Sequence, residues 1–206
     1  MRFSDKEIDK LKKAVKGRLS EKRFLHTLGV LDVAQKLAIF CEVENVDEIK
    51  VAALLHDIAK EITLESQCQL IKTGDFKVSE SDFINPAVLH SFAAPTLVKR
   101  DFRYFATENV LSAIFNHTVG APDMSVFDEI IFLADFIEDT RKHDVCVNLR
   151  AFVWDNMING NTESNIKTLH TACIKAIDYT VLNLIENKKH INIRNILTRN
   201  SLLSKI

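Results

Sequence analysis

The scarcity of glycine and proline is the feature that most limits what this chain of 206 residues can fold into. It contains five Gly and three Pro, whereas average usage would give about 25 such residues in a chain of this length. Because these residues mark most turns and end most helices, the chain has few turns and long periodic segments. The sequence therefore predicts an all-α protein. No repeat or linker divides it, so we expect a single domain over residues 1–206, a helical bundle with a substantial core.

Capping residues, breakers and apolar residues at three- and four-residue spacing set the boundaries of the predicted helices. Ser4 and Glu7 have the spacing of a capping box, which opens the first helix. Gly29 lies inside the second helix, where glycine is unfavourable and usually marks a close helix contact. Pro95 is expected to stop or kink its helix soon afterwards. We predict helices at about 4–17, 20–40, 46–61, 86 to just beyond 95, 108–117, 124–137, 145–157, 163–187 and 191–206, and short helices around a turn at 74–75.

Charge and cysteine placement exclude several classes of protein. The net charge of -1 and the pI near 6.7 argue against a dedicated binder of nucleic acid or of membrane surfaces. The longest strongly apolar run, near 130–134, is far too short to span a bilayer, and the N-terminus is too polar for a signal peptide. We therefore expect a soluble, cytoplasmic protein with no nucleic-acid or membrane partner. The sequence leaves the oligomeric state open, with a homodimer among the options.

The cysteines lie far apart in the chain and form no C-x-x-C pair. This spacing fits reduced, mostly buried thiols better than a disulfide framework or a structural zinc site. The four residues are Cys41, Cys68, Cys146 and Cys173.

The apolar stretch from Val51 to Lys60 contains an imidazole and a carboxylate side by side, His56 and Asp57. Burying a carboxylate costs several kcal/mol unless a partner or a metal compensates it. An isolated pair of this kind is more typical of a helix end, with Asp57 and Lys60 in water. A metal site becomes the better interpretation only because similar residues occur elsewhere in the chain.

Three further histidines lie in apolar settings. His26 shares a helix face with Val30 and Val33, and His117 is preceded at helical spacing by Ile114. Taken singly, His26 and His117 are each more typical of a hydrogen-bonded core histidine. His90 precedes a break in the helix, and in the simplest interpretation it would be exposed.

Asp135 is harder to explain without a metal. It lies among Ile131, Phe132 and Phe136, with no basic residue within one helical turn. A buried carboxylate needs a partner, and a metal is the best available. Together the histidines and the two aspartates supply four imidazoles and two carboxylates without a thiolate, a ligand set that two divalent metals need.

Several ordered motifs resemble the HD-domain metal-dependent phosphohydrolases in the variant with a dinuclear centre. More narrowly, they resemble the YqeK-type symmetrical diadenosine tetraphosphate hydrolases, over nearly the whole chain. The matching segments are RFLHTLGV (23–30), AALLHDIAK (52–60), PAVLH (86–90), AIFNHTVG (113–120) and LADFIEDTR (133–141), together with 172–179 and 198–203.

The chain departs from the family pattern at three places. Ser91 stands where glycine is often found, Asp139 stands where proline is usual, and the stretch 152–168 is longer than expected. None of these removes a ligand, but Ser91 and the longer stretch bear on pocket shape and substrate choice. A second His-Asp pair, His143-Asp144, has polar neighbours, and we interpret it as surface.

The resemblance implies which residues hold the metals. Asp57, next to His56, is the natural bridge between two ions, and such a centre attracts phosphate and acidifies a bridging water to hydroxide at neutral pH. Iron, divalent or trivalent, is the first choice for this ligand set, with manganese, zinc and nickel as alternatives. One ion would be shared by His26, His56 and Asp135, and the other by His90 and His117.

Other side chains are placed to contact substrate. Lys60 lies one helical turn from His56 and counts with Asp57 as catalytic, although a solvated helix end is its simpler interpretation. Arg23 stands three residues before His26, Thr118 directly follows His117, and the fork of Arg141 is suited to a distal phosphate.

The residues alone predict a phosphoester or phosphoanhydride hydrolase. The resemblance implies the substrate, diadenosine tetraphosphate, cut in the middle to two ADP molecules. Two alternatives remain: an HD-type phosphatase acting on nucleoside monophosphates or another nucleotide, and a non-catalytic nucleotide-sensing module.

Overall fold

The computed structural model describes residues 2–206, and within that range the regular elements are helices, with no strand. This confirms the all-α fold class. The α-helices are α1 (Asp5–Lys16), α2 (Glu21–Phe40), α3 (Val46–Leu55), α4 (Leu64–Thr73), α5 (Leu89–Asp101), α6 (Glu108–Asn116), α7 (Val126–Ile137), α8 (Asp144–Asn156), α9 (Thr162–Glu186) and α10 (Ile193–Leu203). Three short 3-10 helices are η1 (Glu80–Ile84), η2 (Pro86–Val88) and η3 (Arg103–Phe105).

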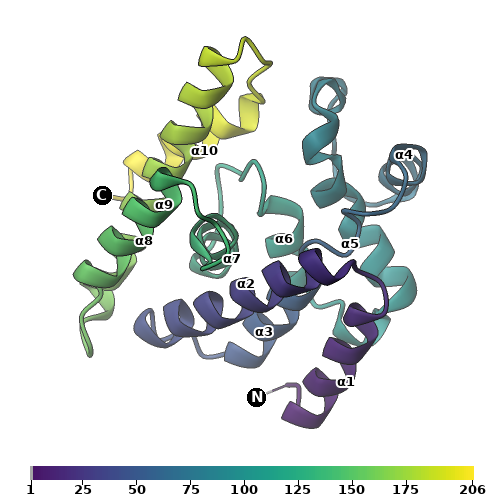
Figure 1. Ribbon diagram of the computed structural model, residues 1–206, viewed down its shortest axis with the longest axis horizontal. Coiled ribbons are helices and arrows are strands. Elements are labelled where there is room, and N and C mark those ends of the chain that lie inside the picture. The colour runs from purple at the N-terminus through teal and green to yellow at the C-terminus, as the bar shows by residue number, and fades with distance from the viewer. Residues whose placement is uncertain (1) are drawn as a thin grey trace.

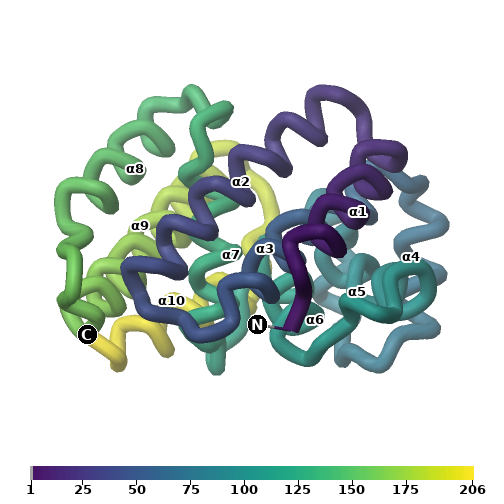
Figure 2. The backbone as a smooth tube through the Cα atoms, turned by 90° about the horizontal axis from the view of Figure 1, so that it is seen from below, coloured from purple at the N-terminus to yellow at the C-terminus, as the bar shows by residue number. Residues whose placement is uncertain are grey.

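Helix α7 lies at the centre of the bundle. It contacts α2, α3, α6, α8 and α9, and Figure 1 shows it end-on between α2 and α9. In the view turned by 90°, α8 and α9 lie on one side of the molecule and α4 and α5 on the other (Figure 2). One cluster of buried apolar residues extends from Phe3 to Leu202. Helices that are far apart in sequence therefore meet around α7.

The sequence predictions about the capping box, the last three helices and the cysteines are confirmed. The capping box forms, with the Ser4 amide donating to Glu7 Oε2 at 2.8 Å and the Glu7 amide donating to Ser4 Oγ at 3.4 Å. The last three helices begin and end within a few residues of their predicted limits. All four cysteines are free, and three of them are buried. Within residues 2–206, no helix is both long enough and apolar enough to cross a membrane.

Two predicted helix boundaries are wrong. Helix α3 ends at Leu55 rather than near residue 61, because the chain tightens into turns in which the Ile58 amide donates to the Leu55 carbonyl (3.1 Å) and the Lys60 amide to the Asp57 carbonyl (2.9 Å). Helix α5 continues past Pro95 to Asp101. Pro95 is buried in a helix that packs against both α4 and α6, so tertiary contacts outweigh the missing backbone hydrogen bond.

Gly29 allows α2 and the end of α7 to approach closely, as its position inside a helix predicted. A Cβ atom at residue 29 would lie 2.3 Å from Glu138 Oε2 and 3.3 Å from Glu138 Cβ. Glu138 is fully buried, so its side chain has little room to move away. Any larger side chain at residue 29 would separate the two segments.

We expect Gly29→Ala to destabilise the protein. Alanine should gain about 1 kcal/mol of helix propensity, but overpacking against Glu138 costs about 1–3 kcal/mol. Chemical denaturation should therefore show a net fall in the free energy of unfolding. Gly17→Ala is the control, since a Cβ there meets nothing closer than 3.5 Å. Gly29→Ala with unchanged or increased stability would contradict this account of the contact.

Candidate metal centre

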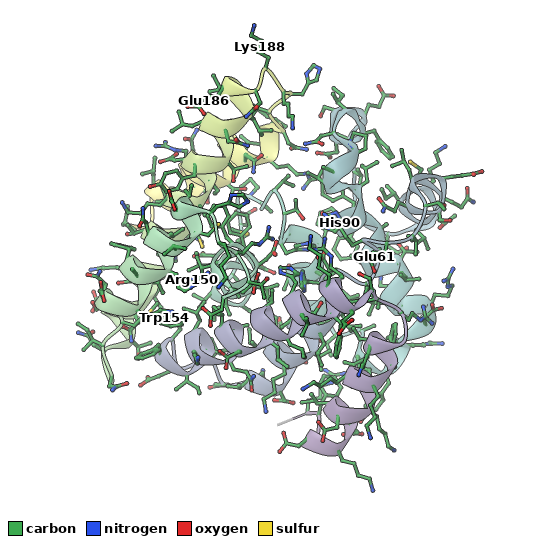
Figure 3. All side chains as sticks on the ribbon, in the orientation of Figure 1. Glu61, His90, Arg150, Trp154, Glu186 and Lys188 are labelled. Carbon is green, nitrogen blue, oxygen red and sulfur yellow. The ribbon has the colours of Figure 1, made fainter. Side chains whose placement is uncertain are left out.

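The six predicted ligands converge on one place inside the bundle. All but one of them are buried, and Asp135 is the exception, with its side chain 20% exposed. Figure 3 shows His90 in the interior, between the ribbons of the central helices. The ligands come from α2 (His26), the turn after α3 (His56 and Asp57), α5 (His90), the residue after α6 (His117) and α7 (Asp135).

Each of the four histidines in the centre has one ring nitrogen that faces a hydrogen-bond acceptor. The Nδ1 atoms of His56, His90 and His117 face the carbonyl oxygen three residues earlier, at 2.8, 3.0 and 2.7 Å. The Nδ1 atom of His26 faces Glu138 Oε1 at 3.0 Å. Because these oxygens only accept, Nδ1 of each ring carries a proton, and Nε2 becomes the free ligand atom when the ring is neutral.

The two oxygens of Asp57 face different pairs of these Nε2 atoms. Oδ2 lies 3.6 Å from His26 and 3.5 Å from His56, whereas Oδ1 lies 3.2 Å from His90 and 3.7 Å from His117. Asp57 thus stands between two imidazole pairs, the arrangement expected of a carboxylate that bridges two ions.

The spacing of the donor atoms suits first-row metal ions. The Nε2 atoms are 3.4 Å apart in the His26–His56 pair and 3.1 Å apart in the His90–His117 pair. Metal–nitrogen bonds of about 2.1 Å at angles near 90–110° would place neighbouring ligands ~3.0–3.4 Å apart. Two groups have all their donor atoms within 4.8 Å of one another: His26 with His56 and Asp135, and His56 with Asp57 and His117. His56 is close to both halves, so its assignment to one ion stays a prediction.

The protonation states also suit cations. Burial opposes ionisation of Asp57, but the neighbouring imidazoles of His56, His117 and His90 outweigh it and hold its pKa well below the usual range. Burial lowers the pKa of His90 to about 4, so this ring is neutral. Burial also lowers the pKa of His26, but hydrogen bonds to Asp135 and Glu138 outweigh it and raise the pKa to about 9. An ionised carboxylate and a neutral imidazole are the forms that bind metal, and at His26 a metal would displace a proton.

Asp135 has a basic partner that the sequence analysis did not find. Nη2 of Arg141 lies 2.6 Å from Asp135 Oδ1, and His26 Nε2 lies 3.0 Å from the same oxygen. After α7 the chain turns back, with the Arg141 amide donating to the Glu138 carbonyl at 3.0 Å, and this turn returns the guanidinium to the helix. Arg141 lies six residues from Asp135, beyond the one helical turn that lacks a basic residue, so Asp135 has a charged partner without a metal. The case for a metal rests on the converging Nε2 atoms instead.

Glu138 is a further site residue to which the sequence analysis gave no role. It accepts hydrogen bonds from the Thr140 amide at 2.7 Å and the Thr140 hydroxyl at 2.5 Å, as well as facing His26. It therefore fixes the orientation of the His26 ring. A carboxylate directly after an apolar helix, together with Gly29 inside another helix, was the only signal for it in the sequence.

The predicted substrate contacts surround the centre. Arg23 Nη1 lies 2.8 Å from Asp57 Oδ2, and Thr118 Oγ1 lies 3.4 Å from His90 Nε2. Lys60 is half-buried, with its Nζ 3.2 and 3.3 Å from the two ring nitrogens of His90, so it is not a solvated helix end. A cavity of about 430 Å³ adjoins His26 and is lined by Lys22, Arg23, His26, Glu138, Thr140, Arg141, Lys142 and His143.

Two departures from the family pattern are accommodated locally. Ser91 is fully buried, and its hydroxyl donates to the Val88 carbonyl at 2.8 Å. Asp139 is exposed and pairs with Arg150 at 3.2 Å, and Arg150 also donates to the carbonyls that end α7. His143 and Asp144 are both exposed, as predicted, although His143 lines the cavity.

The longer stretch 152–168 lies away from the centre. Trp154 contacts Phe40 with 6.4 Å between ring centroids, and Asn165 Nδ2 donates to the Phe40 carbonyl at 2.8 Å. Phe40 ends α2, about 21 Å along the helix from His26 at 1.5 Å per residue. Figure 3 likewise shows Trp154 far from His90. This stretch therefore does not shape the pocket.

Comparison with known proteins identifies the family. The family model described as HD domain matches residues 23–139, which contain all six predicted ligands. A Bacillus subtilis (strain 168) protein named "Bis(5'-nucleosyl)-tetraphosphatase, symmetrical" is 30% identical over 190 residues, covering 92% of this chain and 94% of that protein. A Halalkalibacterium halodurans protein of the same name is 36% identical over 130 residues, covering 62% of this chain and 67% of that protein.

A solved structure agrees with these matches. The crystal structure of a protein from Clostridium acetobutylicum, described as a predicted HD superfamily hydrolase involved in NAD metabolism, superimposes with a TM-score of 0.81 at 30% identity. The match covers 96% of this chain and 97% of the other. The chain therefore belongs to the HD-domain family, and it is a hydrolase of that family.

Proposed function

We propose that this chain is a metal-dependent hydrolase that cleaves diadenosine tetraphosphate symmetrically into two ADP molecules. The observation that carries the proposal is the convergence of the four Nε2 atoms on the two oxygens of Asp57. Relatives named as symmetrical tetraphosphatases support the substrate. Residues 1–206 would act as one HD-domain unit in the cytoplasm, with a nucleotide as the partner.

The residues present fit two first-row ions. In this proposal His26, His56 and Asp135 would hold one ion and His90 and His117 the other, with Asp57 as a ligand to both. The ions would supply the positive charge that binds phosphate oxygens and makes hydroxide available from water at neutral pH. Iron suits mixed imidazole and carboxylate ligands without thiolate, and manganese, zinc or nickel would suit them as well.

The side chains expected to contact substrate, three of them cationic, lie on both flanks of the centre. Arg23 and Arg141 lie beside Asp57 and Asp135 near His26, whereas Lys60 and Thr118 lie beside His90. In a chain of four phosphates cut at the middle anhydride, two phosphates extend to each side of the broken bond. Cations on both flanks would therefore hold both halves of such a substrate.

The proposed reaction is the attack of water at the middle of the phosphate chain. Water oxygen bonds to one of the two central phosphorus atoms, and the bond from that phosphorus to the central bridging oxygen breaks. The bridging oxygen leaves with the second ADP. The ammonium group of Lys60, 3.2 Å from His90, is placed to offset negative charge as it develops, and the forked guanidinium of Arg141 is suited to bind a distal phosphate.

The first prediction concerns metal and product together. Purified protein should contain close to two ions per chain and convert diadenosine tetraphosphate to ADP alone. Asp57→Ala should lose metal and activity together, because Asp57 is the expected bridge. Asp144→Ala is the control, since Asp144 is exposed. Full activity in Asp57→Ala would refute the dinuclear centre, and preferential cleavage of nucleoside monophosphates would favour the phosphatase alternative. No turnover with added metal would favour a nucleotide sensor.

The second prediction concerns phosphate recognition. Lys60→Ala and Arg141→Ala should keep both ions but lower kcat/KM on the tetraphosphate by about 30-fold, equivalent to about 2 kcal/mol for a truncated charged contact. Steady-state kinetics and metal analysis test this in the same preparations. Lys36→Ala, which removes an exposed lysine paired with Asp32, should leave both measurements unchanged. Unaltered kinetics in the two test variants would remove Lys60 and Arg141 from phosphate binding.

The third prediction concerns metal-linked stability at Asp135. In metal-free buffer Asp135→Asn should be less stable than the wild type, because it breaks the ion pair with Arg141. Added metal should raise the Tm of the wild type more than that of Asp135→Asn, since a ligand that binds only the folded state stabilises it more the more tightly it binds. Asp178→Asn breaks an ion pair with Arg199 instead and should respond to metal as the wild type does. An equal metal-induced gain in Asp135→Asn would remove Asp135 from the centre.

A further inference from the structure

One side chain of α10 contacts both helices that present His90 and His117. The guanidinium carbon of Arg194 lies 5.3 Å from the ring centroid of Phe92 and 5.2 Å from that of Phe115. Phe92 is two residues after His90 in α5, and Phe115 is two residues before His117 in α6. At these distances a cation is attracted by the face of each ring. Arg194 therefore links the two helices directly behind their histidines.

Arg194 is itself held in place. Its Nε lies 3.3 Å from both carboxylate oxygens of Asp82, and its Nη2 donates to the Lys77 carbonyl at 2.9 Å. Asp82 is fully buried, and Asn192 Nδ2 also donates to it at 2.8 Å. A buried charge with this many partners has one favourable position, so the guanidinium has little freedom between the two rings.

The same helix also holds the loop that leads away from His117. The Val119 carbonyl accepts from Asn195 Nδ2 at 3.3 Å. Thr198 Oγ1 lies 3.4 Å from the same carbonyl, and its hydroxyl also donates to the Arg194 carbonyl at 2.7 Å. Asn195 and Thr198 are both buried. Gly120 has a φ of 74°, and a Cβ there would lie 2.6 Å from Thr198 Oγ1. Glycine is thus needed both for the backbone conformation and for the close approach of α10.

The last residues of the chain also contact the part of this loop that follows Gly120. The Ser201 hydroxyl donates to the Pro122 carbonyl, and Lys205 Nζ donates to the Met124 carbonyl at 2.8 Å. Carbonyl groups between His117 and the start of α7 thus find their donors in the last residues of the chain. The loop has no regular secondary structure, so these bonds define its course together with its own turns, in which the Gly120 amide donates to the Asn116 carbonyl and the Met124 amide to the Ala121 carbonyl.

The opposite half of the centre is fixed by other elements. His26 is oriented by Glu138, which follows α7, and the carbonyls that end α7 accept from Arg150 of α8. Its supports therefore come from α7 and α8, whereas those of the His90–His117 pair include α10. The two halves should respond separately when one set of supports is removed.

We propose that α10 positions the His90–His117 half of the centre, with Arg194, Asn195 and Thr198 as positioning residues, so that tight binding of the second ion requires α10 in place. This inference rests on the proposed dinuclear function. Residues that orient metal ligands from outside the coordination sphere typically change metal affinity or activity by about 10–100-fold when mutated. The loss of affinity should affect only one of the two ions.

The test is a titration of metal-free protein with manganese(II), with unbound Mn²⁺ measured by electron paramagnetic resonance. The wild type should bind two ions. In Arg194→Ala and Thr198→Val one affinity should fall by about 10-fold or more while the other stays unchanged. Turnover should show a lower kcat with little change in KM. Thr198→Ser keeps the hydroxyl and should restore both affinities. Arg199→Ala, on the same helix but paired with Asp178, is the control.

The outcomes separate this inference from the proposed function. Two unchanged affinities in Thr198→Val and Arg194→Ala would overturn the role of α10, and so would an equal fall in both affinities, which would mean a general loss of stability. If Arg194→Ala does not fold, the comparison of Thr198→Val with Thr198→Ser decides the question. A wild type that does not bind two ions would overturn the dinuclear centre itself, and this inference with it.

Discussion

The buried carboxylate of Asp57 is the constraint on which the rest of the structure depends. With Asp57 only 3% exposed, an ionised carboxylate is strongly unfavourable unless positive or hydrogen-bonding groups surround it. Four imidazoles and the guanidinium of Arg23 do so, and they come from α2, the turn after α3, α5 and the end of α6. The bundle must therefore bring the ends and interiors of separate helices to one point, around the central helix α7.

Two of these imidazoles are oriented by hydrogen bonds at helix ends. The last carbonyl groups of a helix lack backbone donors, and His56 and His117 follow directly after α3 and α6. The Nδ1 proton of each ring binds the carbonyl three residues earlier. One hydrogen bond thus satisfies an orphaned carbonyl and directs Nε2 toward Asp57. This is why the early end of α3 matters: a continued helix would have used the same carbonyl for its own backbone.

The distribution of charge connects this geometry with the proposed substrate. The chain as a whole is nearly neutral, yet Arg23, Lys60 and Arg141 all lie within hydrogen-bonding distance of groups in the centre. Their placement on both flanks suits a long polyphosphate better than a single terminal phosphate. The supports of the two halves also differ, with Glu138 behind His26 and α10 behind the His90–His117 pair.

The sequence by itself determined the helical class, most helix limits and the six residues that converge, because periodicity, caps and polar residues in apolar runs are properties of chain neighbours. It did not determine which groups pair across the fold. Glu138 reaches His26 across 112 residues, and Thr198 reaches Val119 across 79. Even Arg141 reaches Asp135 only through the turn that ends α7. Such partners depend on how whole helices pack. No pattern among neighbouring residues indicates the distant partner of a carboxylate or hydroxyl, so only the tertiary structure decided these contacts.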